Sequence, residues 1–137
     1  MIIKFYELKK KNLRNNNFFL LYGNNSGLIE ETLNKTIKPL SADNILTYDE
    51  NEIIKNSENF IEDISNKSFF DKEKLIIVKR ATDKILKITE EIVTKEIEDV
   101  ILVLVSGILE KKSKLRTFFE KEKNTMCIPF YEDNQQS

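Results

Sequence analysis

Two uninterrupted apolar runs constrain the fold of this chain more than any other feature. Residues 100–105 have the sequence Val-Ile-Leu-Val-Leu-Val, and residues 75–78 have the sequence Leu-Ile-Ile-Val between charged neighbours. A strand that is covered on both faces shows continuous hydrophobicity, whereas a half-exposed strand alternates. Both runs therefore predict strands at the centre of a sheet that has helices packed above and below it.

Further apolar segments predict an alternation of strands and helices along the whole chain. The predicted strands are residues 18–22, 45–48, 75–78, 100–105 and 126–131. The first predicted helix begins after the turn at residues 23–27 and ends at Pro39. Three further helices are predicted at residues 50–65, 82–97 and 113–121. The apolar stripes of the four helices are Leu28, Ile29, Leu33 and Ile37; Ile53, Ile54, Phe60, Ile61 and Ile64; Ile85, Ile88, Ile92, Val93 and Ile97; and Leu115, Phe118 and Phe119. Right-handed crossovers then give an α/β, three-layer fold with a five-stranded parallel sheet.

The two ends of the chain give weaker patterns. Residues 1–17 predict a short strand or helix packed at the edge of the domain. Pro129 within the last predicted strand indicates an edge position or a bulge, because proline has no N–H for a central ladder. The polar ending at residues 132–137 leads us to expect a fragment of a longer chain.

Composition limits the classes of function. A chain of 137 residues, 40% hydrophobic and 33% charged, fits one globular domain. The single cysteine, Cys127, and the lack of histidine exclude an intrachain disulfide and histidine-based catalysis or metal binding. Because Cys127 lies in a predicted strand, we expect a buried hydrophobe rather than a reactive thiol. No apolar run approaches the roughly twenty residues of a membrane span, and we expect a cytoplasmic protein with no membrane partner.

Charge gives a second limit. A formal net charge of −1 argues against a free-standing nucleic-acid binder, which would usually carry a basic stripe. Two basic clusters are nevertheless present, namely Lys9, Lys10, Lys11 and Arg14, and Lys111, Lys112, Lys114 and Arg116. Given the balanced charge, we interpret both as solvated surface rather than as phosphate contacts.

A short turn with two glycines follows the first predicted strand, where α/β proteins hold phosphate with backbone N–H groups at a helix start. It consists of Gly23, Asn24, Asn25, Ser26 and Gly27, and either Asn25 or Ser26 is predicted to cap the helix. The phosphate-loop pattern has four residues between its glycines, then Lys, then Ser or Thr. This chain has three, followed by Leu28 and Ile29. An apolar pair supplies neither the cation nor the metal-binding hydroxyl, so a structural turn is favoured.

The acidic residue that would hold magnesium is also missing from the predicted strand ends. Residues 78–80 are Val-Lys-Arg, and residues 105–107 are Val-Ser-Gly. The sequence therefore predicts an NTPase-like skeleton with a degenerate nucleotide site and no cofactor. The alternative is a nucleotide-binding, P-loop-like ATPase domain that uses the shortened loop.

Two adjacent phenylalanines, Phe69 and Phe70, precede the third predicted strand in polar surroundings. Buried in the pocket of a partner, such rings act as hot spots of binding. The alternative is that they cap the core beneath the second predicted helix. Because adjacent residues of an extended segment point to opposite sides, one ring can also lie inward while the other is exposed.

Together these features resemble the N-terminal domain of the bacterial DNA polymerase III delta subunit, a clamp-loader subunit. The matching segments occur in the same order over most of the chain: residues 18–23 with 28–31, 68–70 with 74–78, and 102–104 leading to 112–116. The resemblance implies an AAA+-like fold that has lost ATP binding. It also implies a lid and a collar domain beyond residues 1–137.

The resemblance further implies a clamp-binding segment at Ser68, Phe69 and Phe70, whose hydrophobic pair enters a pocket on the sliding clamp, the beta subunit. The family often has leucine before phenylalanine, so Phe69 departs from the pattern while keeping its apolar character. The implied role is non-catalytic, within the DNA polymerase III holoenzyme. The implied partners are the clamp, the gamma/tau and delta prime subunits, and DNA only within the assembly. A scaffold that contacts only another loader subunit remains a further alternative.

Overall fold

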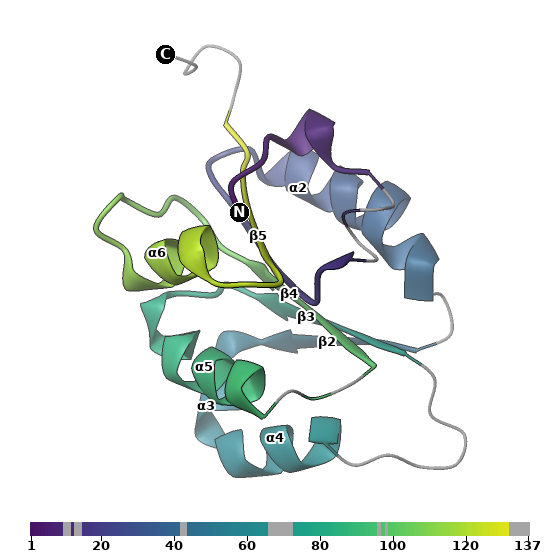
Figure 1. Ribbon diagram of the computed structural model, residues 1–137, viewed down its shortest axis with the longest axis vertical. Coiled ribbons are helices and arrows are strands. Elements are labelled where there is room, and N and C mark those ends of the chain that lie inside the picture. Colours follow the sequence, from purple (N-terminus) through teal and green to yellow (C-terminus); the bar gives the residue numbers. More distant parts are fainter. Residues whose placement is uncertain are drawn as a thin grey trace.

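The computed structural model describes residues 1–9, 12, 15–41, 44–65, 73–95, 97 and 99–131. In this part of the chain, five parallel strands form one sheet in the order β2-β3-β4-β1-β5 (Figure 1). The strands are β1 (Phe18–Tyr22), β2 (Ile45–Asp49), β3 (Lys74–Lys79), β4 (Val100–Val105) and β5 (Thr125–Pro129). The predicted α/β fold is confirmed. The central position of β4 and the edge position of β5 are as predicted.

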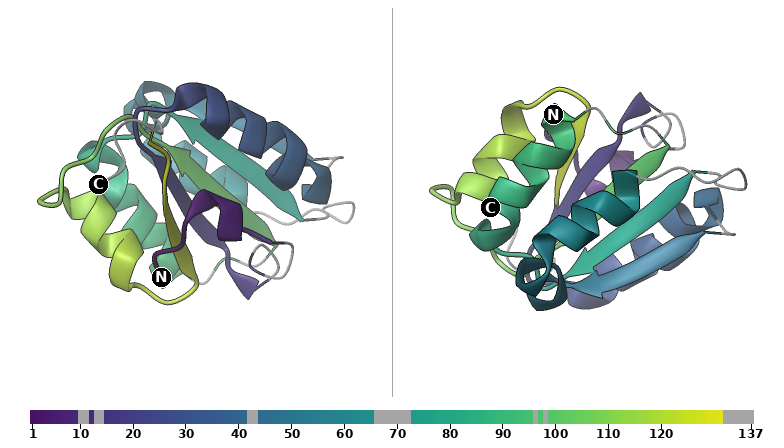
Figure 2. Two further views of the ribbon diagram at one scale, coloured as in Figure 1. Left: turned by 90° about the horizontal axis from the view of Figure 1, so that it is seen from above. Right: turned by 90° about the horizontal axis from the view of Figure 1, so that it is seen from below.

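Helices cover both faces of this sheet (Figures 1 and 2). One face carries α2 (Ser26–Thr32), which continues as a π-helix, η2 (Leu33–Ile37), and a 3-10 turn, η3 (Lys38–Ser41). The other face carries α3 (Glu50–Lys55), α4 (Ser57–Ser65), the 3-10 turn η4 (Asp83–Ile85), α5 (Leu86–Thr94) and α6 (Lys114–Lys121). No helix of the described residues is long and apolar enough to span a membrane.

The core consists of two layers, because successive side chains of a strand point to opposite faces. In β1, Leu20 and Tyr22 pack toward α3 to α6, while Phe19 and Leu21 pack toward α2 and η2. The five residues of β1 are all buried, as expected for a strand with helices on both sides.

The prediction of one helix over residues 50–65 is wrong, because the chain forms α3 and α4 with a break at Asn56 (φ −146°, ψ 50°). Asparagine side chains compete with the backbone for hydrogen bonds, which favours a break at such a position. Ile54, which we predicted on the inner stripe, is 38% exposed. It lies about 100° around the helix from the buried Ile53, at the margin of the stripe.

Smaller differences affect the other helices. The first predicted helix is not a uniform α-helix up to Pro39, since it becomes a π-helix at Leu33 and a 3-10 turn at Lys38. Five residues of the predicted inner stripes are only half-buried, namely Leu28, Ile88, Val93, Ile97 and Phe118. The last strand lies at Thr125–Pro129 rather than at residues 126–131.

The N-terminal segment packs against the edge strand β5. Ile2 forms a parallel bridge with Cys127, and the 3-10 turn η1 (Phe5–Glu7) follows. This agrees with the prediction of a short element at the edge of the domain. Cys127 is fully buried, and desolvation, reinforced by the charge of Glu120, raises the pKa of its thiol to about 12. The thiol is therefore protonated at neutral pH, as expected of a buried hydrophobe.

Candidate functional site

The glycine turn lies at the carboxyl end of β1, where the direction of the sheet connections reverses. The chain leaves β1 through α2 on one face, whereas α3, α4, α5 and α6 return on the other. Parallel α/β sheets bind ligands in the crevice at such a reversal. The turn at Gly23 to Gly27 therefore occupies the position of a phosphate loop, as the sequence predicts.

Two backbone donors of this turn are used inside the protein. The Gly23 N–H donates to the Gly107 carbonyl at 3.0 Å, and the Asn25 N–H donates to the Phe130 carbonyl at 3.1 Å. The side chain of Asn25 accepts from the Leu28 N–H at 3.1 Å, so Asn25, of the two predicted alternatives, caps the helix. A phosphate group would have to compete with these bonds, because it needs the same kind of N–H donors.

Gly23 is required by packing rather than by a ligand. Its φ angle is +134°, a conformation that L side chains rarely adopt. A Cβ atom added there would lie 1.9 Å from the Phe130 carbonyl oxygen. The glycine thus allows the turn to approach the residue that follows β5.

A cavity of about 310 Å³ adjoins the turn at the carboxyl ends of β1, β3 and β4. Its lining includes Ser26 and Glu30 of α2, Lys79 at the end of β3, and Ser106 after β4. The ammonium group of Lys79 forms an ion pair with the carboxylate of Glu30. Ser106 is 4% exposed, and in the described part of the chain its Oγ is the buried side-chain polar atom without a hydrogen-bond partner.

The end of β3 carries two cations where a nucleotide-hydrolysing site needs a carboxylate. Lys79 pairs with Glu30, and Arg80, which has φ 57°, pairs through Nε with Asp49 Oδ1 at 3.2 Å. Sequence reasoning noted that the strand end lacks an acid, but it missed the pairing of Lys79 with Glu30. The pairing could have been predicted from charge, because Glu30 and Lys79 have opposite charges and follow strands whose carboxyl ends meet at one edge of a parallel sheet.

A second group of contacts ties the crossovers together at the same edge. The carboxylate of Asp83 accepts from Ser113 Oγ at 2.6 Å and from the Leu115 and Lys114 N–H groups at 3.2 and 3.3 Å. Ser113 Oγ in turn accepts from the Arg116 N–H at 3.2 Å. Asp83 and Ser113 thus satisfy the N-terminal donors of α6 together. No local sequence pattern indicates this contact, because the residues lie far apart along the chain.

Replacing Asp83 by asparagine is expected to lower the free energy of unfolding by about 1 kcal/mol at neutral pH, since the charged cap of α6 is lost. The hydrogen bond from Ser113, opposed by desolvation and helped by the two N–H groups, lowers the pKa of Asp83 below its usual 3.8. A lowered folded-state pKa contributes stability above the unfolded pKa, and that contribution is lost as pH falls through the folded one. Thermal melting should therefore show a constant difference between wild type and Asp83→Asn above about pH 5, and a difference that shrinks as pH falls from about 5 toward about 2. A difference that does not shrink in acid would mean that the charge plays no part.

The carboxylate of Glu50 makes a similar link between α3 and the end of β3. Glu50 is 4% exposed, and its Oε1 accepts from the Thr82 N–H at 2.7 Å and from Thr82 Oγ1 at 3.0 Å. Together with the Asp83 cap, this contact joins three successive crossovers at one edge of the sheet. The edge is therefore held by specific hydrogen bonds as well as by the core.

Arg116, which we grouped with the surface lysines, does not lie free at the surface. Its guanidinium stacks 5.1 Å from the centre of the Tyr22 ring, donates to Glu120 at 3.1 Å and to the Leu109 carbonyl at 3.0 Å. These contacts hold the Arg116 side chain against the protein and help to pack α6 on the sheet. The interpretation of Arg116 as solvated surface is wrong.

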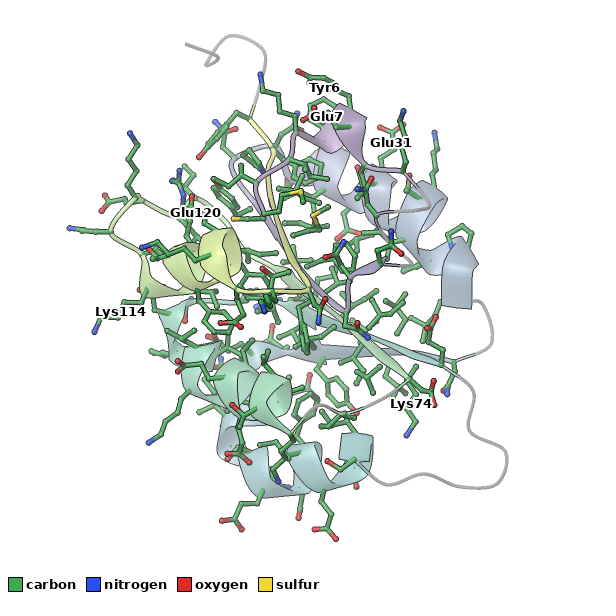
Figure 3. All side chains as sticks on the ribbon, viewed as in Figure 1. Tyr6, Glu7, Glu31, Lys74, Lys114 and Glu120 are labelled. Atoms are coloured by element: carbon green, nitrogen blue, oxygen red, sulfur yellow. The ribbon has the colours of Figure 1, made fainter. Side chains whose placement is uncertain are left out.

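The predicted clamp-binding residues Ser68, Phe69 and Phe70 lie outside the described residues. The described chain stops at Ser65, the end of α4, and resumes at Glu73, just before β3. Because β3 starts there, Glu73 lies at the edge of the sheet opposite to the glycine turn. Figure 3 shows this separation through Lys74, the first residue of β3, and Lys114, the first residue of α6, at opposite ends of the molecule.

The fold and the glycine turn together define the class of the domain. It is a P-loop-like α/β domain in which N–H groups at the phosphate-loop position donate hydrogen bonds to the protein's own carbonyl groups. Residues 19–129 match the family described as DNA polymerase III, delta subunit, and the chain belongs to this family. It is thus a clamp-loader component of the DNA replication machinery. No curated protein matches the sequence.

Proposed function

We propose that this domain binds the sliding clamp, the beta subunit, through Phe69 and Phe70 and helps to open it for loading onto DNA. The observation that carries the proposal is the family match over residues 19–129, which includes the aromatic pair. In the proposal Ser68 precedes the two rings, which fill an apolar pocket of the clamp. Polar neighbours around such rings exclude water from the contact.

The proposed role is non-catalytic. Three observations argue against nucleotide binding. Two N–H donors of the turn bond to Gly107 and Phe130. The apolar pair Leu28 and Ile29 follows Gly27 in place of a cation and a hydroxyl, and Lys79 ends β3 in place of an acid. The competing proposal, an ATPase that uses the shortened turn, requires magnesium-ATP to displace these contacts. Calorimetric titration with magnesium-ATP distinguishes the two, because measurable binding would support the ATPase.

Ring opening requires more than tight binding. A ligand shifts a closed-to-open equilibrium only by its preference for the open form. The domain must therefore make contacts with the clamp beyond the aromatic pair, and we propose that the end of α4, which precedes the pair in the chain, supplies them. Its side chains Phe60, Ile61 and Ile64 are buried against the core, so α4 is fixed relative to the sheet.

The domain is further proposed to act within a longer chain and a larger assembly. Residues 1–137 would form the AAA+-like N-terminal domain, followed by lid and collar domains. The gamma/tau and delta prime subunits would be its neighbours, and DNA would be contacted only within the assembly.

The first test is a direct binding measurement between this domain and the sliding clamp of the same source. We expect a stable complex by surface plasmon resonance without nucleotide, and an unchanged affinity when magnesium-ATP is added, because the proposed contact does not involve the glycine turn. Absence of binding would contradict the proposal and favour a scaffold that contacts only another loader subunit. Dependence on ATP would instead favour the ATPase alternative.

A further inference from the structure

The ion pair between Lys79 and Glu30 stands where a nucleotide-binding domain would hold its metal. In the phosphate-loop pattern, the hydroxyl residue that binds magnesium follows the first glycine by seven positions. Because the turn is one residue short, a count from Gly27 puts Ile29 at that position and a count from Gly23 puts Glu30 there. The acid that completes the metal site comes from a strand end, and here that end is Lys79. Relative to a metal site, the helix has gained a negative charge and the strand a positive one.

We propose that Glu30 is an internal anion that keeps phosphate-like oxyanions out of the cavity at the carboxyl edge. Its carboxylate neutralises Lys79, the cation that an incoming oxyanion would need. It also places a negative charge at the wall of the cavity. Both effects act against a second anion, and neither depends on whether the domain binds the clamp.

The rest of the cavity retains groups that suit an oxyanion. Ser26 and Ser106 both line it, and the buried hydroxyl of Ser106 has no hydrogen-bond partner. The Lys79 side chain is 31% exposed, so it can reach a ligand in the cavity. A cation with two hydroxyls is a set of donors that phosphate accepts from readily. The chemical class of ligand that Glu30 excludes is therefore a small inorganic phosphate.

The test is titration with magnesium-free inorganic pyrophosphate at constant ionic strength, followed by calorimetry and by the amide resonances of Gly27 and Ser106. The variant Glu30→Gln keeps the shape of the side chain but removes its charge. We expect it to bind pyrophosphate about tenfold or more tightly than the wild type, since one close like charge is removed. The double variant Glu30→Gln, Lys79→Met should lose this gain, because it lacks the cation.

The matched control is Glu31→Gln on the same helix. Glu31 pairs with Lys35 at 3.0 Å, does not line the cavity, and is labelled in Figure 3. It should bind pyrophosphate as the wild type does. Circular dichroism checks the fold of every variant, and Glu30→Ser provides a second neutral side chain. The proposal is overturned if the neutral variants bind no better than the wild type, or if the gain persists without Lys79.

Discussion

The double variant Phe69→Ala, Phe70→Ala is expected to bind the sliding clamp roughly a thousandfold more weakly than the wild type. Two aromatic hot spots contribute about 2 kcal/mol each, and their sum corresponds to that factor in the dissociation constant. Surface plasmon resonance with immobilised clamp measures the change. Melting temperature and circular dichroism should stay close to the wild type if the two rings contact the clamp rather than the core.

The matched control is Tyr6→Ala. Tyr6 is an aromatic residue that is 65% exposed on η1, remote in sequence from the aromatic pair, and its loss should leave clamp binding unchanged. If the double variant unfolds, the two rings belong to the core and the proposed contact is wrong. The single variants then identify which ring is inward, since only the inward one should lower the melting temperature.

The sheet could be predicted from the sequence because its strands are continuous apolar runs. Residues 75–78 and 100–105 lie within β3 and β4, and the buried residues of β1 fall at the predicted positions. A strand of this kind can be predicted without information on distant contacts, because burial on both faces leaves a continuous apolar run within the segment itself. The break at Asn56 could not be predicted, since the apolar stripe continues in phase from Ile53 to Phe60.

The candidate site was predicted in position but not in its contacts. The glycine turn is visible as a local pattern, and so is the missing acid at Lys79. The pairing of Lys79 with Glu30 joins residues 49 positions apart, and the cap of α6 by Asp83 joins residues about thirty apart. Both depend on the strand order β3-β4-β1, which brings separate strand ends to one edge. A pattern in one segment does not contain that information.

Gly23→Ala is expected to lower the free energy of unfolding by about 3 kcal/mol or more. The backbone strain of a side chain at positive φ contributes about 1–2 kcal/mol, and overpacking contributes about 1–3 kcal/mol more. The clash falls on the Phe130 carbonyl, which accepts from the Asn25 N–H, while the Phe130 N–H donates to the Tyr22 carbonyl at 2.7 Å. Thermal melting should show a decrease of roughly 10 °C for a domain of this size.

Gly107→Ala is the matched control, because no atom lies within 4 Å of a Cβ added there. Its free energy of unfolding should change by less than about 1 kcal/mol. Both variants are measured without nucleotide, which separates two explanations of the glycine turn. If Gly23 served only to bring a phosphate close to the backbone, its replacement would leave the ligand-free domain as stable as the wild type. A large loss of stability in Gly23→Ala alone would instead mean that the glycine is required by the contact with Phe130, so that a glycine turn at this position is no sign of nucleotide binding.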